Sequence, residues 1–164
     1  MTKRTDLSAQ QKAFFDRLRS GTWDKPAGIA NLGIKPEEWL KDVRYGYTRY
    51  EWPNTGDRDI STARVFGGWV AALSDHIVSM TMASALEDGE WFTTTELQTR
   101  ILRPVPHGTI HIEGRLVSRG RTTGLVEADW HDEKGRLLAR ITAAKAIRSM
   151  EELGGPAVRA AKAE

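Results

Sequence analysis

Asp75 is the residue of this sequence whose surroundings point most directly to chemistry. It is the only Asp, Glu, Lys or Arg between Arg64 and Glu87, and it closes the stretch FGGWVAALSD at positions 66–75. An ionised carboxylate among apolar neighbours is costly unless something pairs with it or uses it. A carboxylate in such a place can act as a general base or as a nucleophile.

The two glycines ahead of Asp75 provide a second chemical group. Gly67 and Gly68 stand directly before an apolar run that is typical of a helix, which we expect over residues 68–87 and ending at Asp88-Gly89. Amides at the start of a helix lack intrahelical partners and lie at its positive end. They can therefore bind an anion or an oxyanion that develops during a reaction.

Composition narrows the classes of protein to which this site could belong. The chain has 164 residues, no cysteine and a net charge of +2. It is long enough for one domain with a sizeable core, and thiol or zinc–thiolate chemistry is excluded. Basic and acidic residues are mixed, which disfavours a nucleic-acid partner. We expect neither a signal peptide nor a membrane span, and a cytoplasmic location.

The remaining elements must position these groups. We expect an amphipathic helix over residues 7–19, a short helix opened by Pro36, and a strand over 43–52. After the long helix the hydrophobic period changes to two, which predicts four strands linked as an antiparallel meander. These strands are expected at residues 92–102, 109–118, 123–131 and 136–147.

Together these elements predict an α+β fold with three parts. Residues 1–42 form an N-terminal helical extension packed on the body, 43–148 form the body, and 149–164 form a flexible C-terminal tail. A long helix that is apolar on most sides is usually enclosed, so the sheet is expected to curl around it. The edges of such a sheet favour pairing with a second copy.

The order of elements and three motifs resemble the hotdog fold, in particular thioesterases of the 4-hydroxybenzoyl-CoA and phenylacetate-degradation type. The motifs are Gly67-Gly68 followed after four residues by LSD at 73–75, the run TTTELQTRILRP at 93–104, and VSRGR at 117–121. The family usually reads His-Gly-Gly, whereas this chain has Phe66 before the glycines. Some relatives place an asparagine six residues upstream of that histidine, where Ile60 stands here.

The resemblance implies an acyl-CoA thioesterase that needs no cofactor beyond the coenzyme A of its substrate. Asp75 would activate water or attack the carbonyl, the Gly67 amide would hold the oxyanion, and Thr94 would position the water. Gly67 and Asp75 are eight residues apart, on the order of 10 Å along one helix. A single thioester carbon cannot lie close to both, so the site predicts a homodimer at least, or a tetramer.

The resemblance also assigns residues to the substrate. Phe66 and Gly68 would shape the acyl pocket, and the coenzyme A phosphates would meet cations at strand ends or turns. These cations are Arg103, Arg119, Arg121 and Lys145, and Gly120 between two of them permits a close backbone approach. We expect no metal site, because no other metal-ligating residues stand near the histidines at a spacing typical of metal sites.

Three alternatives remain open at this point. Asp75 could be a structural residue paired with an arginine across a dimer interface. A hydratase of the same fold is disfavoured, because no Asp/His pairing is evident; His76 points away from Asp75 on a helix. A non-catalytic protein that binds acyl-CoA or another small ligand would reuse the same groove without needing Asp75.

Overall fold

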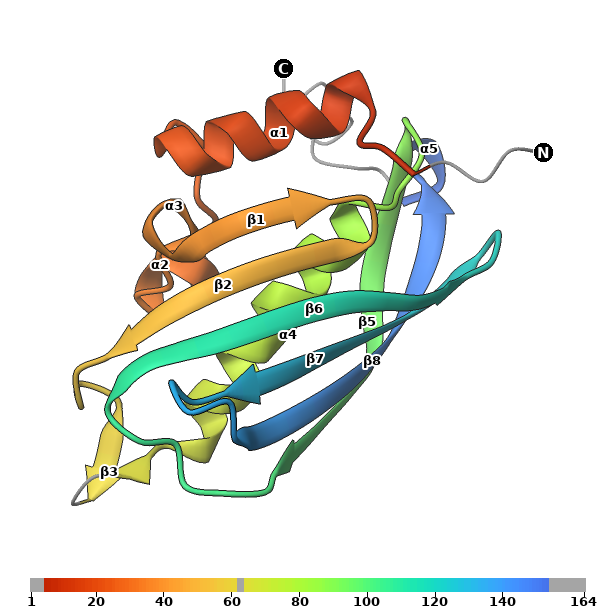
Figure 1. The fold of residues 1–164 in the computed structure, drawn as a ribbon. Helices are drawn as coiled ribbons and strands as arrows, with labels where there is room; N and C mark the ends of the chain where they lie inside the picture. Colours follow the sequence, from red (N-terminus) through yellow and green to blue (C-terminus); the bar gives the residue numbers. More distant parts are fainter. Residues whose placement is uncertain (1–4, 62–63, 154–164) are drawn as a thin grey trace.

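A six-stranded antiparallel sheet wraps around one long helix, α4 (Gly67–Ala83), in the computed structural model, which describes residues 5–61 and 64–153 (Figure 1). The strand order is β1-β2-β6-β7-β8-β5, and a separate two-stranded sheet pairs β3 with β4. The strands are β1 (Leu40–Arg44), β2 (Tyr47–Asn54), β3 (Asp59–Ser61), β4 (Arg64–Val65), β5 (Glu90–Ile101), β6 (Gly108–Arg119), β7 (Thr123–His131) and β8 (Leu137–Ser149). The predicted α+β hotdog fold is confirmed.

The core lies between α4 and the concave face of the sheet. Leu73 and Ile77 of the helix are fully buried, as are the inward-facing Ile112, Val126 and Ile141 of the strands. The helix is shorter than predicted and ends before Ser84, not at Asp88-Gly89. It stops there because the chain turns away, with the Ser84 hydroxyl donating to the Thr81 carbonyl and accepting from the Gly46 amide.

The strand predicted over residues 43–52 is in fact a hairpin of β1 and β2. The two strands pair antiparallel around Tyr45 and Gly46, and Gly46 has a φ of 67°, which other residues rarely adopt. A side chain at Gly46 would also lie 2.9 Å from Leu116 Cβ. The single-strand prediction failed because tyrosines flank the glycine and hide the turn. The boundary expected at residue 42 therefore falls inside β1.

The predicted four-strand meander holds only for β6, β7 and β8. Strand β5 pairs with β8 along its whole length, from Glu90 opposite Ser149 to Ile101 opposite Ala139. The segment after β5 then crosses to β6 on the far side of β7 and β8 (Figure 1). This arrangement leaves β5 as an edge strand whose other side has no partner strand among the described residues, and most of its side chains are exposed.

The first N-terminal helix packs at the C-terminal end of α4, whereas Trp39, at the end of the third, contacts Trp69 near the start of α4. Helix α1 (Ala9–Ser20) begins at a capping box formed by Ser8 and Gln11 and ends at Gly21. The Gln11 amide also donates to the carbonyls of Ala83, the last residue of α4, and of Leu86 just after it. Helix α2 (Ala27–Asn31) was not predicted, whereas α3 (Pro36–Trp39) starts at its proline as expected. Within the predicted tail, α5 (Met150–Leu153) is described and residues 154–164 lie outside the described part.

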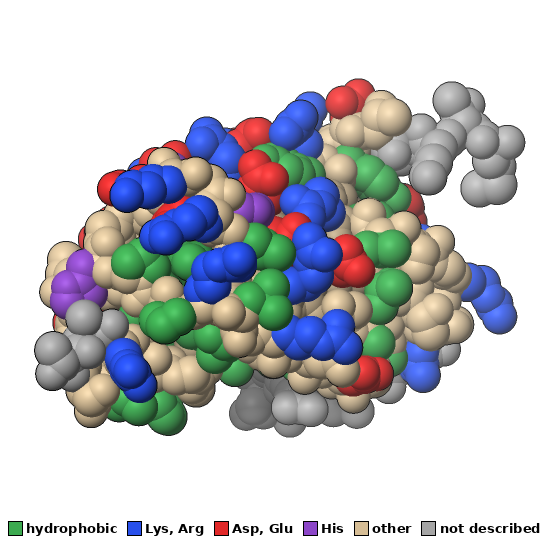
Figure 2. All heavy atoms as spheres, turned by 60° about the horizontal axis from the view of Figure 1, so that its bottom comes forward, with side chains coloured by type: hydrophobic (Ala, Val, Ile, Leu, Met, Phe, Trp, Pro, Cys, Tyr) green, Lys and Arg blue, Asp and Glu red, His purple; other side chains and the backbone are tan. Residues whose placement is uncertain are grey.

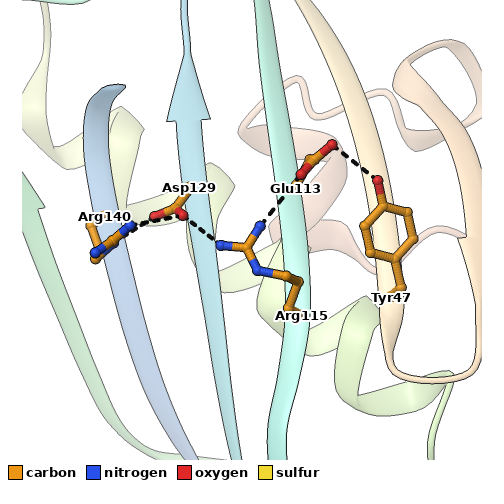
Figure 3. Close-up of polar contacts among 5 residues, drawn as sticks. All are labelled: Tyr47, Glu113, Arg115, Asp129 and Arg140. Carbon is orange, nitrogen blue, oxygen red and sulfur yellow. Dashed lines mark hydrogen bonds and ion pairs between the residues drawn. The ribbon is translucent and has the colours of Figure 1, made fainter. Parts of the chain in front are cut away.

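The convex face of the sheet carries a polar network across four strands (Figure 3). Asp129 accepts hydrogen bonds from Arg140 and Arg115, and Arg115 and Tyr47 both donate to Glu113. Burial alone would raise the pKa of Asp129, but the two guanidinium groups outweigh it and hold the pKa below its usual value. No helix in the described part of the chain is long and apolar enough to cross a membrane.

Candidate active site

Asp75 lies in the third turn of α4 with its carboxylate at the margin of the core. Its side chain is 46% exposed in the single subunit, so the carboxylate is in contact with solvent although its sequence neighbours are apolar. The residues on either side of it are buried instead: Ser74 accepts a hydrogen bond from the Trp130 indole, and His76 lies 3.4 Å from the Tyr50 hydroxyl. His76 is thus a packed core residue, as expected, and burial lowers its pKa to about 4.

Three elements bring three polar side chains together around Asp75. The Lys145 Nζ atom lies 2.7 Å from Thr94 Oγ1, 3.0 Å from Ser79 Oγ and 3.5 Å from Asp75 Oδ1. Thr94 Oγ1 lies 3.1 Å from the same Asp75 oxygen. Asp75 and Ser79 are four residues apart on α4, which puts them on one face of the helix. Thr94 of β5 and Lys145 of β8 are direct partners in the sheet.

Lys145 is not where the sequence analysis placed it. It was expected at a strand end, in reach of substrate phosphates, but β8 continues to Ser149 and the Lys145 side chain is 0% exposed. Its stem points toward α4, and its ammonium lies 5.5 Å from the centre of the Phe92 ring. Burial lowers the pKa of Lys145, and the Asp75 carboxylate partly offsets this effect.

The donor and acceptor roles in this cluster follow from the chemistry of lysine. An ammonium group only donates, so Thr94 Oγ1 must accept from Lys145 and turn its own hydrogen toward Asp75 Oδ1. Asp75 Oδ1 thereby accepts hydrogen bonds from both Thr94 and Lys145. No hydrogen bond to Asp75 Oδ2 is found within the described residues, which leaves that oxygen for a water or a substrate.

The start of α4 provides the second half of the expected site. Gly67 is its first residue, so its amide and that of Gly68 have no intrahelical acceptor. The Phe66 ring is 55% exposed and covers Gly68, where an added Cβ would come within 2.6 Å of the ring. An added Cβ at Gly67 would lie 3.4 Å from Ile101 Cδ1. The start of α4 therefore lies beside the C-terminal end of β5.

A cavity of about 360 Å³ opens next to this helix start. Its lining is mostly apolar and includes Ile60, Val65, Val70, Ile101, Leu102 and Arg103. Figure 2 turns this end of the molecule toward the viewer and shows Lys and Arg side chains set among hydrophobic ones. An apolar chain that carries a negative charge fits such a surface better than a neutral polar ligand does.

The predicted cations fall at opposite ends of the sheet. Arg103 follows β5 near Gly67, and its guanidinium donates to the Leu137 carbonyl at 2.7 Å. Arg119, Gly120 and Arg121 lie at the β6–β7 turn, near the end of β8 that carries Lys145. Arg121 is exposed, whereas Arg119 is mostly buried and forms an ion pair with Glu90. No group of residues that could hold a metal ion is found in the described part of the chain.

Within one protomer the structure joins Asp75 to Thr94 but not to Gly67. Both lie on α4, eight residues apart, which corresponds to about 12 Å of helix rise. The sequence analysis missed Ser79 altogether, although its spacing of four residues from Asp75 was a usable signal. It also missed the direct contact of Lys145 with Asp75, which depends on the pairing of β5 with β8.

Comparison with known proteins shows which family the chain resembles. Residues 63–139 match the family model described as the thioesterase superfamily. The resemblance to the hotdog thioesterases is confirmed. This match covers α4, β5 and β6, β7 and the start of β8, and it includes Gly67, Asp75 and Thr94. It supports the prediction that the protein is an enzyme, a hydrolase acting on thioesters.

Solved structures of thioesterases share the fold. A phenylacetic acid degradation-related protein of Ralstonia eutropha, described as a candidate thioesterase, is 27% identical, with a TM-score of 0.67 over 81% of this chain and 98% of that one. A thioesterase of Haemophilus influenzae is 18% identical, with a TM-score of 0.69 over 82% and 90%. A hypothetical thioesterase of Streptococcus pneumoniae, solved with coenzyme A, is 17% identical, with a TM-score of 0.63 over 74% and 97%. None of the curated proteins compared matches the sequence.

Proposed function

We propose that this protein is an acyl-CoA thioesterase whose active site is shared between two subunits. Asp75 of one subunit, which accepts a hydrogen bond from Thr94, activates a water molecule, and the Gly67 amide of the other subunit holds the carbonyl oxygen. The observation that carries the proposal is the position of the two half-sites along one edge strand. Thr94 contacts Asp75 near the start of β5, and Ile101 lies against Gly67 at its end.

The geometry of β5 explains how a second copy would complete the site. An exposed edge strand can pair antiparallel with its own copy about a twofold axis. If that axis passes through Gln98, the two copies of Gln98 face each other, and Thr94 of one subunit lies beside the partner subunit's Ile101. Asp75 of one subunit then faces the helix start of the other, and two identical sites form.

Hydrolysis at such a site proceeds in balanced steps. Asp75 Oδ2 takes a proton from water while the water oxygen attacks the thioester carbon. The carbonyl electrons move onto its oxygen, where the Gly67 amide and the positive end of α4 stabilise the charge. The carbon–sulfur bond then breaks, and the thiolate leaves as coenzyme A after protonation. The other product is a carboxylate.

The alternative route has Asp75 as the nucleophile, giving a mixed anhydride that water then opens. Single-turnover hydrolysis in ¹⁸O-labelled water tests this route, because incorporation of the label into Asp75 would show that Asp75 was the nucleophile. The hydrogen bonds to Oδ1 support the base route, since they leave one oxygen open to accept a proton.

We propose coenzyme A as the carrier of the acyl group, from the exposed cations of this chain and from one similar solved structure. Arg103 and Arg121 are exposed cations at the two ends of β5, which the dimer would bring to the same site. Coenzyme A is anionic, and the Streptococcus pneumoniae structure contains it. Arg119 is occupied by Glu90, so we assign it no direct contact. The cytoplasmic location and the lack of a further cofactor stay predictions.

The test is hydrolysis of a panel of acyl-CoA esters by the wild type and by Asp75→Asn. We expect thiol release by the wild type and its loss in the variant, with Glu127→Gln on the convex face as a matched control that keeps full activity. Thermal stabilisation by acyl-CoA without hydrolysis would support the non-catalytic binding alternative instead.

A further inference from the structure

Lys145 is a charged side chain enclosed in the core side of the candidate site. Its side chain is 0% exposed, and its ammonium touches three oxygens, on Thr94, Ser79 and Asp75. The Phe92 ring closes another side of the ammonium. A side chain so enclosed cannot reach the phosphates of a substrate that approaches from solvent. Its role must be exerted through the residues that it touches.

The hydrogen bonds of Lys145 determine which atoms of the site remain free. Because Lys145 donates to Thr94 Oγ1 at 2.7 Å, the Thr94 hydrogen is directed to Asp75 Oδ1 at 3.1 Å. Without the ammonium, the Thr94 hydroxyl could turn and accept a hydrogen bond from another donor. The Asp75 side chain, which is 46% exposed, would then be free to rotate.

We propose that Lys145 is a positioning residue of the active site, which fixes the Thr94 hydroxyl as a donor to Asp75 Oδ1 and leaves Oδ2 as the reacting oxygen. This inference rests on the proposed thioesterase function. It replaces the expectation that Lys145 binds coenzyme A. It also changes the role of Thr94, whose hydrogen goes to Asp75 and not to the attacking water.

If Lys145 only held the fold together, Lys145→Met would lower the melting temperature. The positioning role predicts that it does not. Taking an ammonium out of water is unfavourable, and replacing a buried ion pair by apolar groups is often neutral or stabilising. Asp75 is half-exposed, so water can solvate it when the lysine is absent. Methionine has nearly the length of the lysine stem and fits among Phe92 and the core of β8. Lys145→Met should therefore melt no lower than the wild type while its chemistry is impaired.

The experiment measures kcat, KM and melting temperature for Lys145→Met, Thr94→Val and the double variant, with an acyl-CoA that the wild type hydrolyses. We expect kcat to fall by about 10-fold to 100-fold in Lys145→Met, with KM unchanged, because a small misplacement of a reacting group has an effect of that size. The double variant should be no slower than the slower single variant, since both changes remove the same constraint on Asp75. Lys134→Met, in the exposed β7–β8 turn, is the matched control and should keep wild-type kcat.

Two further variants keep the inference open to refutation if Lys145→Met does not fold. Lys145→Gln retains N–H donors and should keep more activity than Lys145→Met. Thr94→Ser retains the hydroxyl and should restore most of the kcat lost in Thr94→Val. Three outcomes with an active wild type would overturn the positioning role. They are an unchanged kcat in Lys145→Met, an increase in KM alone, and fully additive losses in the double variant. A wild type that hydrolyses no acyl-CoA would overturn the proposed function, and this role with it.

Discussion

Replacing Gly67 by proline removes the backbone N–H proposed to bind the oxyanion and leaves the helix intact. Gly67 is the first residue of α4, the position at which proline is best tolerated because that N–H has no helical acceptor. The preceding Phe66 has φ −58° and ψ 124°, which is the extended conformation that a following proline requires. The variant therefore removes the Gly67 N–H without demanding a change of backbone.

The size of the effect follows from the role assigned to this amide. Loss of one oxyanion donor typically lowers kcat by about 100-fold to 1000-fold, or roughly 3 to 4 kcal/mol of transition-state stabilisation. The KM should change little, because the ground-state carbonyl needs the donor less than the oxyanion does. The melting temperature should be unchanged or raised, since proline also restricts the unfolded chain.

Gly67→Ala is the matched control for this substitution. It keeps the N–H, and its Cβ would lie 3.4 Å from Ile101 Cδ1, an ordinary contact. Steady-state hydrolysis of an acyl-CoA, followed by thiol release, compares the two variants, and a thermal melt checks that both fold. Equal kcat for Gly67→Pro and Gly67→Ala would refute the assignment of the Gly67 amide as an oxyanion donor.

Three other predictions concern stability and assembly. Burial lowers the pKa of His76 to about 4, below its value in the unfolded chain, so the free energy of unfolding should fall by about 3 kcal/mol as the pH falls from 8 to 4. Chemical denaturation of His76→Gln should show a smaller fall over this range, because the variant lacks the titrating group. The same pH dependence in the wild type and the variant would contradict the burial argument. Gln11→Ala removes the hydrogen bonds from its amide to the Ala83 and Leu86 carbonyls and the capping bond to Ser8, and should lower the free energy of unfolding by about 1 to 3 kcal/mol. The exposed Gln10→Ala should not, and equal stabilities of the two variants would mean that these contacts do not hold α1 on the body. Gln98→Glu brings two carboxylates together near the proposed twofold axis and should weaken the dimer in light-scattering measurements, and a dimer of unchanged stability would argue against pairing through β5.

The sequence predicted the elements best where the hydrophobic period of a segment matches its burial in the fold. The apolar run after Gly67 predicted the central helix, and the period of two after it predicted four strands within a few residues. Turns that hide inside an alternating pattern were not visible. Gly46 sits between tyrosines, so the β1–β2 hairpin looked like one strand. The place of β5 beside β8 is a matter of tertiary packing, which periodicity does not encode.

The same division applies to the site. Asp75 could be found because it is the one charge in a long apolar stretch, and the match to a family motif drew attention to Gly67 and Thr94. The enclosure of Lys145 could not be foreseen, because it depends on the strand direction and on the register of β5 with β8. A lysine two residues from a predicted strand end reads as a surface cation, whereas here its stem faces the helix.

A hybrid of two inactive variants tests the shared active site most directly. When Gly67→Pro and Asp75→Asn chains are co-expressed with different tags, each mixed dimer contains one site with both wild-type groups and one site with neither. Random pairing then predicts about a quarter of wild-type activity in the mixture, and about half in purified mixed dimers. Activity no higher than that of the separate variants would contradict a site built from Asp75 of one subunit and Gly67 of the other.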